Sequence, residues 1–180
     1  IKPSGTVSLL NGSTPGIHFP EDEYYIRRIR FAKDSQLIEP LREAGYRIED
    51  DKYSPNTLCV EFPVKEPHFV KGKRDVSMWE QLEIAAQYQH YWADNSVSIT
   101  VTFKPEEAHQ IKDALEMYET RLKAVSFLRY EETGYEQAPY EPITKEQYEE
   151  MIKGITPIQR IETNEGGTGT KFCSNDTCEV

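Results

Sequence analysis

Segments with strand-like and helix-like patterns alternate along this chain, and the alternation limits its fold more than any other feature. Aromatic and branched residues, typical of strands, are concentrated at 24–31, 57–62, 96–103 and 124–128. A helical pattern follows each of these segments. Because strands joined through helices usually lie parallel in one sheet, the sequence predicts an α/β fold, with mostly parallel strands connected by crossover helices.

Capping signals mark where the helices begin. Ser77 followed by Glu80 is a capping box that opens the clearest helix, which runs to about Trp92. A second box at Thr144 opens the last helix, which ends near Gly154. The other helices are predicted over 36–44 and from Pro105 onward, where proline occupies the first helical position.

The first residues combine loop chemistry with a helix start, in the segment Lys2-Pro3-Ser4-Gly5-Thr6-Val7. Ser4 is a good helix N-cap, and Gly5 lets a ligand approach the backbone closely. The first N–H groups of a helical turn have no partner within the helix, and the helix dipole favours an anion there. With the Ser4 and Thr6 hydroxyls, the segment suits a phosphate. An ordinary capped turn has the same composition, so the residues alone leave both interpretations open.

Two cysteines, Cys173 and Cys178, lie in a stretch rich in Gly, Thr, Asn and Ser that begins at Thr163. This composition has no core-forming pattern and predicts a flexible tail. Exposed thiols exchange with another disulfide through a thiolate and a mixed disulfide, so a redox role is one interpretation. Half of a zinc site and two idle thiols are the others, although zinc needs two further ligands and no histidine lies near.

Several motifs resemble adenosylcobalamin-dependent (class II) ribonucleotide reductases, and look closest to the monomeric, triphosphate-using branch. They are KPSGTVSLL, PGIH and YYIRRIR near the start, WADNSVS at 92–98, QAPY at 137–140, and the terminal Cys-x-x-x-x-Cys. The resemblance covers most of the chain. It implies the C-terminal part of a ten-stranded α/β barrel over residues 1–160, followed by a flexible redox-active tail over 161–180.

The resemblance also implies roles for both ends of the chain. In that family, the segment matching Pro3, Ser4, Gly5, Thr6 and Val7 holds the substrate's phosphates, and a terminal cysteine pair re-reduces the active-site disulfide. The implied reaction is reduction of ribonucleoside triphosphates or diphosphates to 2′-deoxyribonucleotides by thiyl-radical chemistry. Adenosylcobalamin would start the radical, and a thioredoxin-like protein would recycle the tail.

The family's radical cysteine, partner cysteine pair and catalytic Asn and Glu match nothing in this sequence. The resemblance therefore implies that a missing N-terminal part of the same enzyme carries them. Iron-dependent reductases place two adjacent tyrosines in the strand matching 124–128, whereas this chain has Ser126 and Phe127 there. The difference agrees with a radical made locally. A non-catalytic α/β module that binds nucleotide or phosphate, with a cysteine tail for interaction, is the alternative function.

Other candidate residues have ordinary structural interpretations. Arg28 and Arg30 share one face of the 24–31 strand and Arg27 lies on the other. One of them could meet a substrate phosphate or an acidic neighbour, but solvated or ion-paired strand residues are favoured. Cys59, in an apolar strand, is predicted to be a buried, inert thiol. Four scattered histidines are expected at the surface or in packing rather than as metal ligands: His18, His68, His90 and His109.

Composition limits the partners. The net charge of −10 argues against a nucleic-acid polymer, which binds a basic face, whereas one nucleotide needs only local donors. No apolar run approaches the ~18 residues that span a bilayer, and the start lacks a signal-peptide pattern. Three cysteines are few for a secreted disulfide scaffold. We therefore expect no membrane partner and a cytoplasmic location.

Overall fold

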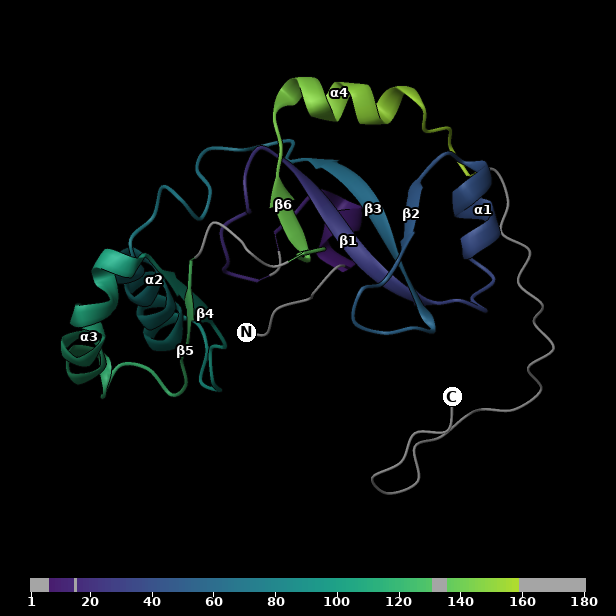
Figure 1. Cartoon of the computed structure of the whole chain (residues 1–180). Helices are drawn as coiled ribbons and strands as arrows, with labels where there is room; N and C mark the ends of the chain where they lie inside the picture. The colour runs from purple at the N-terminus through teal and green to yellow at the C-terminus, as the bar shows by residue number, and fades with distance from the viewer. Residues whose placement is uncertain (1–6, 15, 131–135, 159–180) are drawn as a thin grey trace.

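The computed structural model describes residues 7–14, 16–130 and 136–158. Figure 1 shows helices α2 and α3 with strands β4 and β5 on one side of the molecule, and a larger sheet with α1 and α4 on the other. None of the described helices is long and apolar enough to cross a lipid bilayer.

The larger sheet has four strands in the order β2-β3-β1-β6. They are β1 (Tyr24–Ala32), β2 (Arg47–Asp50), β3 (Thr57–Lys65) and β6 (Tyr140–Pro142). Every neighbouring pair in this sheet is antiparallel, so the prediction of mostly parallel strands is wrong here. The short strand β2 was not predicted. Helix α1 (Ile38–Glu43) connects β1 to β2. Strand β3 lies between β1 and β2 and is antiparallel to both, so β1 and β2 run parallel to each other.

The smaller sheet consists of β4 (Thr100–Phe103) and β5 (Ser126–Arg129), which are parallel as predicted. Their connection contains a 3-10 helix, η2 (Pro105–Gln110), and helix α3 (Ile111–Tyr118). Strand β4 is shorter than the predicted 96–103, although Val97 and Ile99 before it are buried. These residues join a core cluster that includes Met78, Leu82 and Ala85 of helix α2 (Met78–Tyr91).

Helix α2 begins where the sequence predicted, but with half of the expected capping box. The Ser77 hydroxyl accepts the Glu80 N–H at 3.2 Å, which satisfies one free donor of the first turn. The Glu80 carboxylate pairs with Lys71 instead of returning to the cap. In α4 (Lys145–Lys153) both halves of the box are present, between Thr144 and Gln147.

A bidentate ion pair joins α2 to the residues after α3. Both guanidinium Nη atoms of Arg121 lie 2.8 Å from the Glu83 carboxylate oxygens, and the Tyr118 hydroxyl donates to the same carboxylate at 3.0 Å. The hydrogen bonds from Arg121 and then Tyr118 lower the pKa of Glu83 to about 2. Charge-assisted bonding therefore supplements the apolar contacts between the two helices.

Strand β3 continues through Pro63 to Lys65, beyond the predicted end at Phe62. Pro63 pairs with Ile26 of β1, whereas the pairing of β2 with β3 reaches only to Glu61. At Pro63 the strand therefore has β1 as its only strand neighbour among the described residues. A proline without an N–H is tolerated at such an edge-like position.

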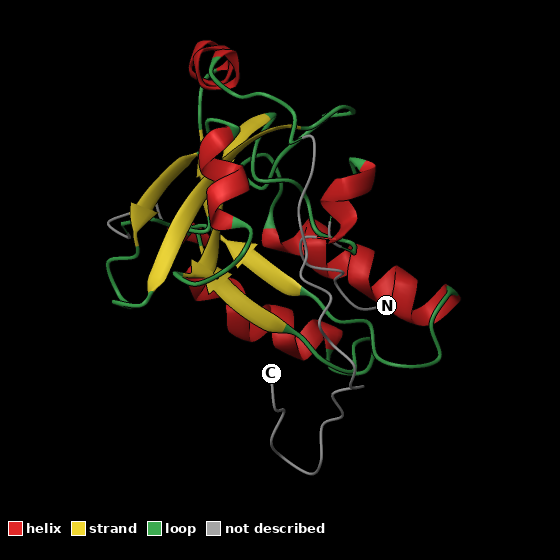
Figure 2. Ribbon diagram, turned by 90° about the vertical axis from the view of Figure 1, so that its right-hand side faces the viewer, coloured by secondary structure: helices red, strands yellow, loops and turns green. Residues whose placement is uncertain are grey.

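Helix α4 lies across the larger sheet and is seen end-on above it in Figure 2. The end of α4 meets the end of α1: Thr156 donates its N–H to the Ala44 carbonyl at 2.8 Å. Gly45 makes this approach possible. Its φ is +88°, and an added Cβ would lie 2.2 Å from the Gly154 carbonyl oxygen. Gly154 itself has a φ of −89° and open space where its Cβ would be.

This contact predicts opposite outcomes for two alanine substitutions. Gly45→Ala should destabilise the protein by about 2 kcal/mol or more, because it combines an unfavourable φ with a backbone clash. Gly154→Ala, the matched control, should change stability by less than about 0.5 kcal/mol. Thermal unfolding of the full-length protein measures both. Equal melting temperatures for the two variants would show that α1 and α4 do not meet here.

Candidate functional site

Most of the predicted site residues lie outside the described residues. This applies to Pro3, Ser4, Gly5 and Thr6, and to both tail cysteines, Cys173 and Cys178. Val7 is described: it is the first residue of the 3-10 helix η1 (Val7–Asn11), and the residue is 67% exposed. The predicted helical turn behind the loop is therefore present as a 3-10 turn. Binding of phosphate by the loop stays a prediction.

The residues after η1 fold back on it and border a cavity of about 530 Å³. The Ser13 N–H donates to the Ser8 carbonyl at 3.1 Å. Gly12 has a φ of +62°, and an added Cβ would lie 3.0 Å from Cγ of Pro67, so the chain comes close to the loop after β3 at this point. Phe19, Lys71 and Tyr88 are among the residues that line the cavity, so loops before β1 and after β3 face α2 across it.

His18 connects this loop to the smaller sheet. Its Nε2 accepts the Thr100 N–H at 3.0 Å. A ring nitrogen that accepts a hydrogen bond carries no proton, so Nε2 is the acceptor in this contact. The sequence alone placed His18 among scattered surface or packing histidines. Only its position within PGIH, close to the predicted phosphate loop, distinguished it from the others.

Arg28 and Arg30 of β1 are ion-paired, as the favoured interpretation predicted. Arg28 Nη2 lies 2.7 Å from Glu61 and 2.5 Å from Glu141, and Arg30 Nε lies 3.0 Å from Asp51. Burial opposes the charge of Arg28, but the hydrogen bonds to both glutamates outweigh it and raise the pKa of this guanidinium. In the described part of the chain, these carboxylates already pair with the positive charges that a bound phosphate would need.

The three arginines of β1 hold the segment before β6 by its backbone. Each guanidinium donates to a different carbonyl oxygen: Arg30 to Gln137 at 3.2 Å, Arg28 to Ala138 at 3.1 Å, and Arg27 to Pro139 at 3.0 Å. Arg27 also lies over the Tyr140 ring, with its Cζ 4.3 Å from the ring centroid. The sequence had marked this segment only as a family-like motif within an irregular stretch.

Cys59 is a buried thiol, as predicted, and the residue is only 1% exposed. Burial raises its pKa, which keeps it protonated and unreactive at neutral pH. In β5, Ser126 is exposed and the Phe127 ring lies 6.3 Å from that of Phe103. Neither side chain is a phenol, and the interpretation that no radical relay follows this strand stays a prediction.

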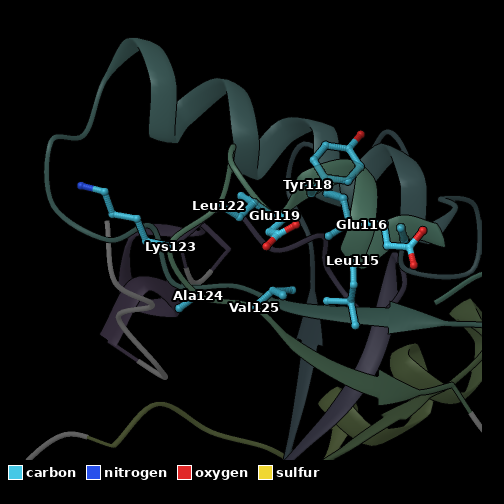
Figure 3. Close-up of a pocket in the computed structure, with 10 residues that line it drawn as sticks. Leu115, Glu116, Tyr118, Glu119, Leu122, Lys123, Ala124 and Val125 are labelled. Atoms are coloured by element: carbon cyan, nitrogen blue, oxygen red, sulfur yellow. The ribbon is translucent and has the colours of Figure 1, made fainter. Parts of the chain in front are cut away.

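Two further features were considered as sites. Across residues 7–14, 16–130 and 136–158, no group of three or more His, Cys, Asp or Glu side chains is placed to hold a metal ion. A groove of about 420 Å³ between the end of α3 and β5 is shown in Figure 3, where Leu115, Leu122 and Val125 contribute to its lining. Its aliphatic side chains suit packing rather than binding of a nucleotide phosphate.

Comparison with known proteins identifies relatives of the chain. No family model matches it. An adenosylcobalamin-dependent ribonucleoside-triphosphate reductase of Euglena gracilis is 48% identical over 99% of this chain and 26% of the relative. A probable reductase of the same name from Dictyostelium discoideum is 44% identical over 100% of this chain and 25% of the relative. The chain thus spans about a quarter of the length of these curated relatives.

A solved structure of a B-12 dependent (class II) ribonucleotide reductase is also similar, with a TM-score of 0.75 and 43% sequence identity. The match covers 87% of this chain and 22% of that one. It confirms the prediction that the chain forms part of this α/β barrel protein. Since the identity to reductases extends along nearly the whole chain, the chain belongs, as one part of such a protein, to the family of adenosylcobalamin-dependent ribonucleotide reductases.

Proposed function

We propose that the chain is the C-terminal segment of an enzyme that reduces ribonucleoside triphosphates, or diphosphates, to 2′-deoxyribonucleotides by thiyl-radical chemistry. One observation supports this most strongly: relatives named adenosylcobalamin-dependent ribonucleoside-triphosphate reductases are 44% to 48% identical along 99% to 100% of the chain. Nothing in the comparisons favours a non-catalytic phosphate-binding module. Within the enzyme, residues 1–160 belong to the barrel and 161–180 form a redox-active tail.

The loop from Pro3 to Val7 is proposed to bind the phosphates of the substrate. Backbone N–H groups at the start of a helical turn, with Ser and Thr hydroxyls beside them, offer a phosphate hydrogen-bond donors without the need for a Lys or Arg side chain. The described residues are compatible with this role, because Val7 opens η1 with an exposed side chain and the following loop borders a cavity. The ion-paired arginines of β1 are not part of this site.

The tail is proposed to supply reducing equivalents. Replacing the 2′-hydroxyl by hydrogen takes two electrons and two protons, releases water, and turns an active-site dithiol into a disulfide. A thiolate of Cys173 or Cys178 attacks that disulfide, and the second tail thiol resolves the mixed disulfide. The active-site dithiol is restored and the tail is left oxidised. A thioredoxin-like protein then reduces the tail, which is consistent with a cytoplasmic, reducing location.

Adenosylcobalamin is proposed as the cofactor of the complete enzyme, in which it would supply the initial radical. The imidazole nitrogen of a histidine can ligate a metal ion, but Nε2 of His18 already accepts the Thr100 N–H. Four cavities lined by described residues have volumes of about 420 to 800 Å³ and lie between helices, loops and the sheets. We assign no residue of this chain to the cofactor.

The phosphate loop is tested by changing Gly5. In the full-length enzyme, Gly5→Val should raise the KM for ribonucleotide about tenfold or more, because a branched side chain would block close approach of a phosphate to the backbone. Gly5→Ala, a smaller step, should have an intermediate effect. Nucleotide binding and steady-state kinetics measure both. An unchanged affinity in correctly folded Gly5→Val enzyme would disprove phosphate binding by this loop.

The tail is tested by the double variant Cys173→Ser/Cys178→Ser in the complete enzyme. With a thioredoxin system it should form about one product per pre-reduced active site, because the chemistry consumes a dithiol that the tail can no longer restore. A small dithiol reagent should rescue turnover, since it diffuses into the site unaided. Product per enzyme in each reductant is the measurement. Repeated turnover with thioredoxin would leave the pair without a shuttle role.

A further inference from the structure

We propose that His18 is a positioning residue for substrate binding: the hydrogen bond from the Thr100 N–H to its Nε2 fixes the chain that follows the phosphate loop against strand β4. This inference rests on the proposed function, in which Pro3 to Val7 binds the substrate's phosphates. His18 itself contacts no reacting atom in this account. It acts through the backbone that leads away from the loop.

The partner of His18 lies on the edge of β4 that β5 does not use. Strand β5 bonds to β4 through alternate residues, as in the hydrogen bonds from Ser126 N–H to Ile99 and from Tyr130 N–H to Phe103. Thr100 and Thr102 have the other parity, so their backbone groups point to the opposite edge. At this edge, which is exposed to solvent at Thr100, the His18 ring supplies the acceptor for the Thr100 N–H.

The next residue on the same edge, Thr102, also has its backbone groups bound by a side chain. The Gln81 carboxamide oxygen accepts the Thr102 N–H at 2.9 Å, while its nitrogen donates to the Thr102 carbonyl at 2.7 Å. Two side chains, one from α2 and one from the loop before β1, thus occupy the place of a neighbouring strand. Gln81 is a buried residue of α2, whereas His18 belongs to the segment that begins at the phosphate loop.

Other described contacts also attach the chain between Val7 and His18. The Ser13 N–H binds the Ser8 carbonyl, and Gly12 lies against Pro67. Ile17 packs against the core cluster of α2, β4 and α3. His18 follows Ile17 directly, so the apolar contact and the hydrogen bond together fix where this segment reaches the sheet. Loss of the bond should let the segment, and the loop before it, shift.

Such a shift would affect binding of the phosphates rather than the reaction at the ribose. The expected signature is a higher KM with an almost unchanged kcat, since the residues proposed for chemistry lie elsewhere. One lost hydrogen bond costs on the order of 1 kcal/mol, and if the whole of it is lost from substrate binding, KM rises about three- to tenfold.

The experiment compares two carboxamide variants in the full-length enzyme. His18→Gln places an acceptor oxygen about as far along the side chain as Nε2, the arrangement that Gln81 already uses at Thr102. His18→Asn carries the same carboxamide one methylene shorter and cannot reach Thr100. We expect His18→Asn to raise the KM for ribonucleoside triphosphate about three- to tenfold at a kcat within about twofold. His18→Gln should restore the KM to within about twofold of the unchanged enzyme.

Gly5→Val in the same assay separates the positioning role of His18 from phosphate binding by the loop. If Gly5→Val raises KM but His18→Asn does not, the loop binds phosphate and the positioning role of His18 is wrong. If neither variant changes KM, phosphate binding by the loop is wrong as well. Equal losses of kcat in His18→Asn and His18→Gln would show a general structural role and would also overturn the proposal. Melting temperatures of both variants confirm that folded enzymes are compared.

Discussion

The three arginines of β1 attach the segment before β6 to the larger sheet by binding the backbone of residues 137–139. Three successive carbonyl oxygens each accept a hydrogen bond from a different guanidinium, and this fixes the segment from which β6 continues. Glu61 and Glu141 neutralise the most buried of the three, Arg28. A buried guanidinium left without its carboxylate would cost about 3–5 kcal/mol, so removing a partner is more disruptive than removing an exposed ion pair.

The sequence predicted the elements of the fold better than their pairing. Capping residues and strand composition located α2, α4, β1 and most of β3, because these signals are local. Strand β2 has only four residues and two opposite charges at its ends, so it shows no clear alternation. Missing one strand reverses the inferred direction of the next, which is why β3 was expected to be parallel. Strand β6 depends on the arginine contacts, which are distant in sequence and invisible to a local pattern.

The candidate site was predictable mainly through the resemblance to reductases, since a Ser-Gly-Thr turn and a cysteine pair each have ordinary structural explanations. The burial of Cys59 and the ion pairs of Arg28 and Arg30 followed from residue type and strand position, and both are confirmed. The bond between His18 and Thr100 could not be foreseen, because it joins residues 82 positions apart through one side-chain nitrogen. Such contacts depend on how β4 is placed, which only the folded chain shows.

The central claim, that this chain is part of an adenosylcobalamin-dependent ribonucleotide reductase, is tested most directly by product formation. The full-length protein would be incubated with each ribonucleoside triphosphate and a dithiol reductant, with and without adenosylcobalamin, and the nucleotides separated chromatographically. The account predicts 2′-deoxyribonucleotides that appear only when the cofactor is present. Absence of product under all conditions, or an equal yield without the cofactor, would contradict it.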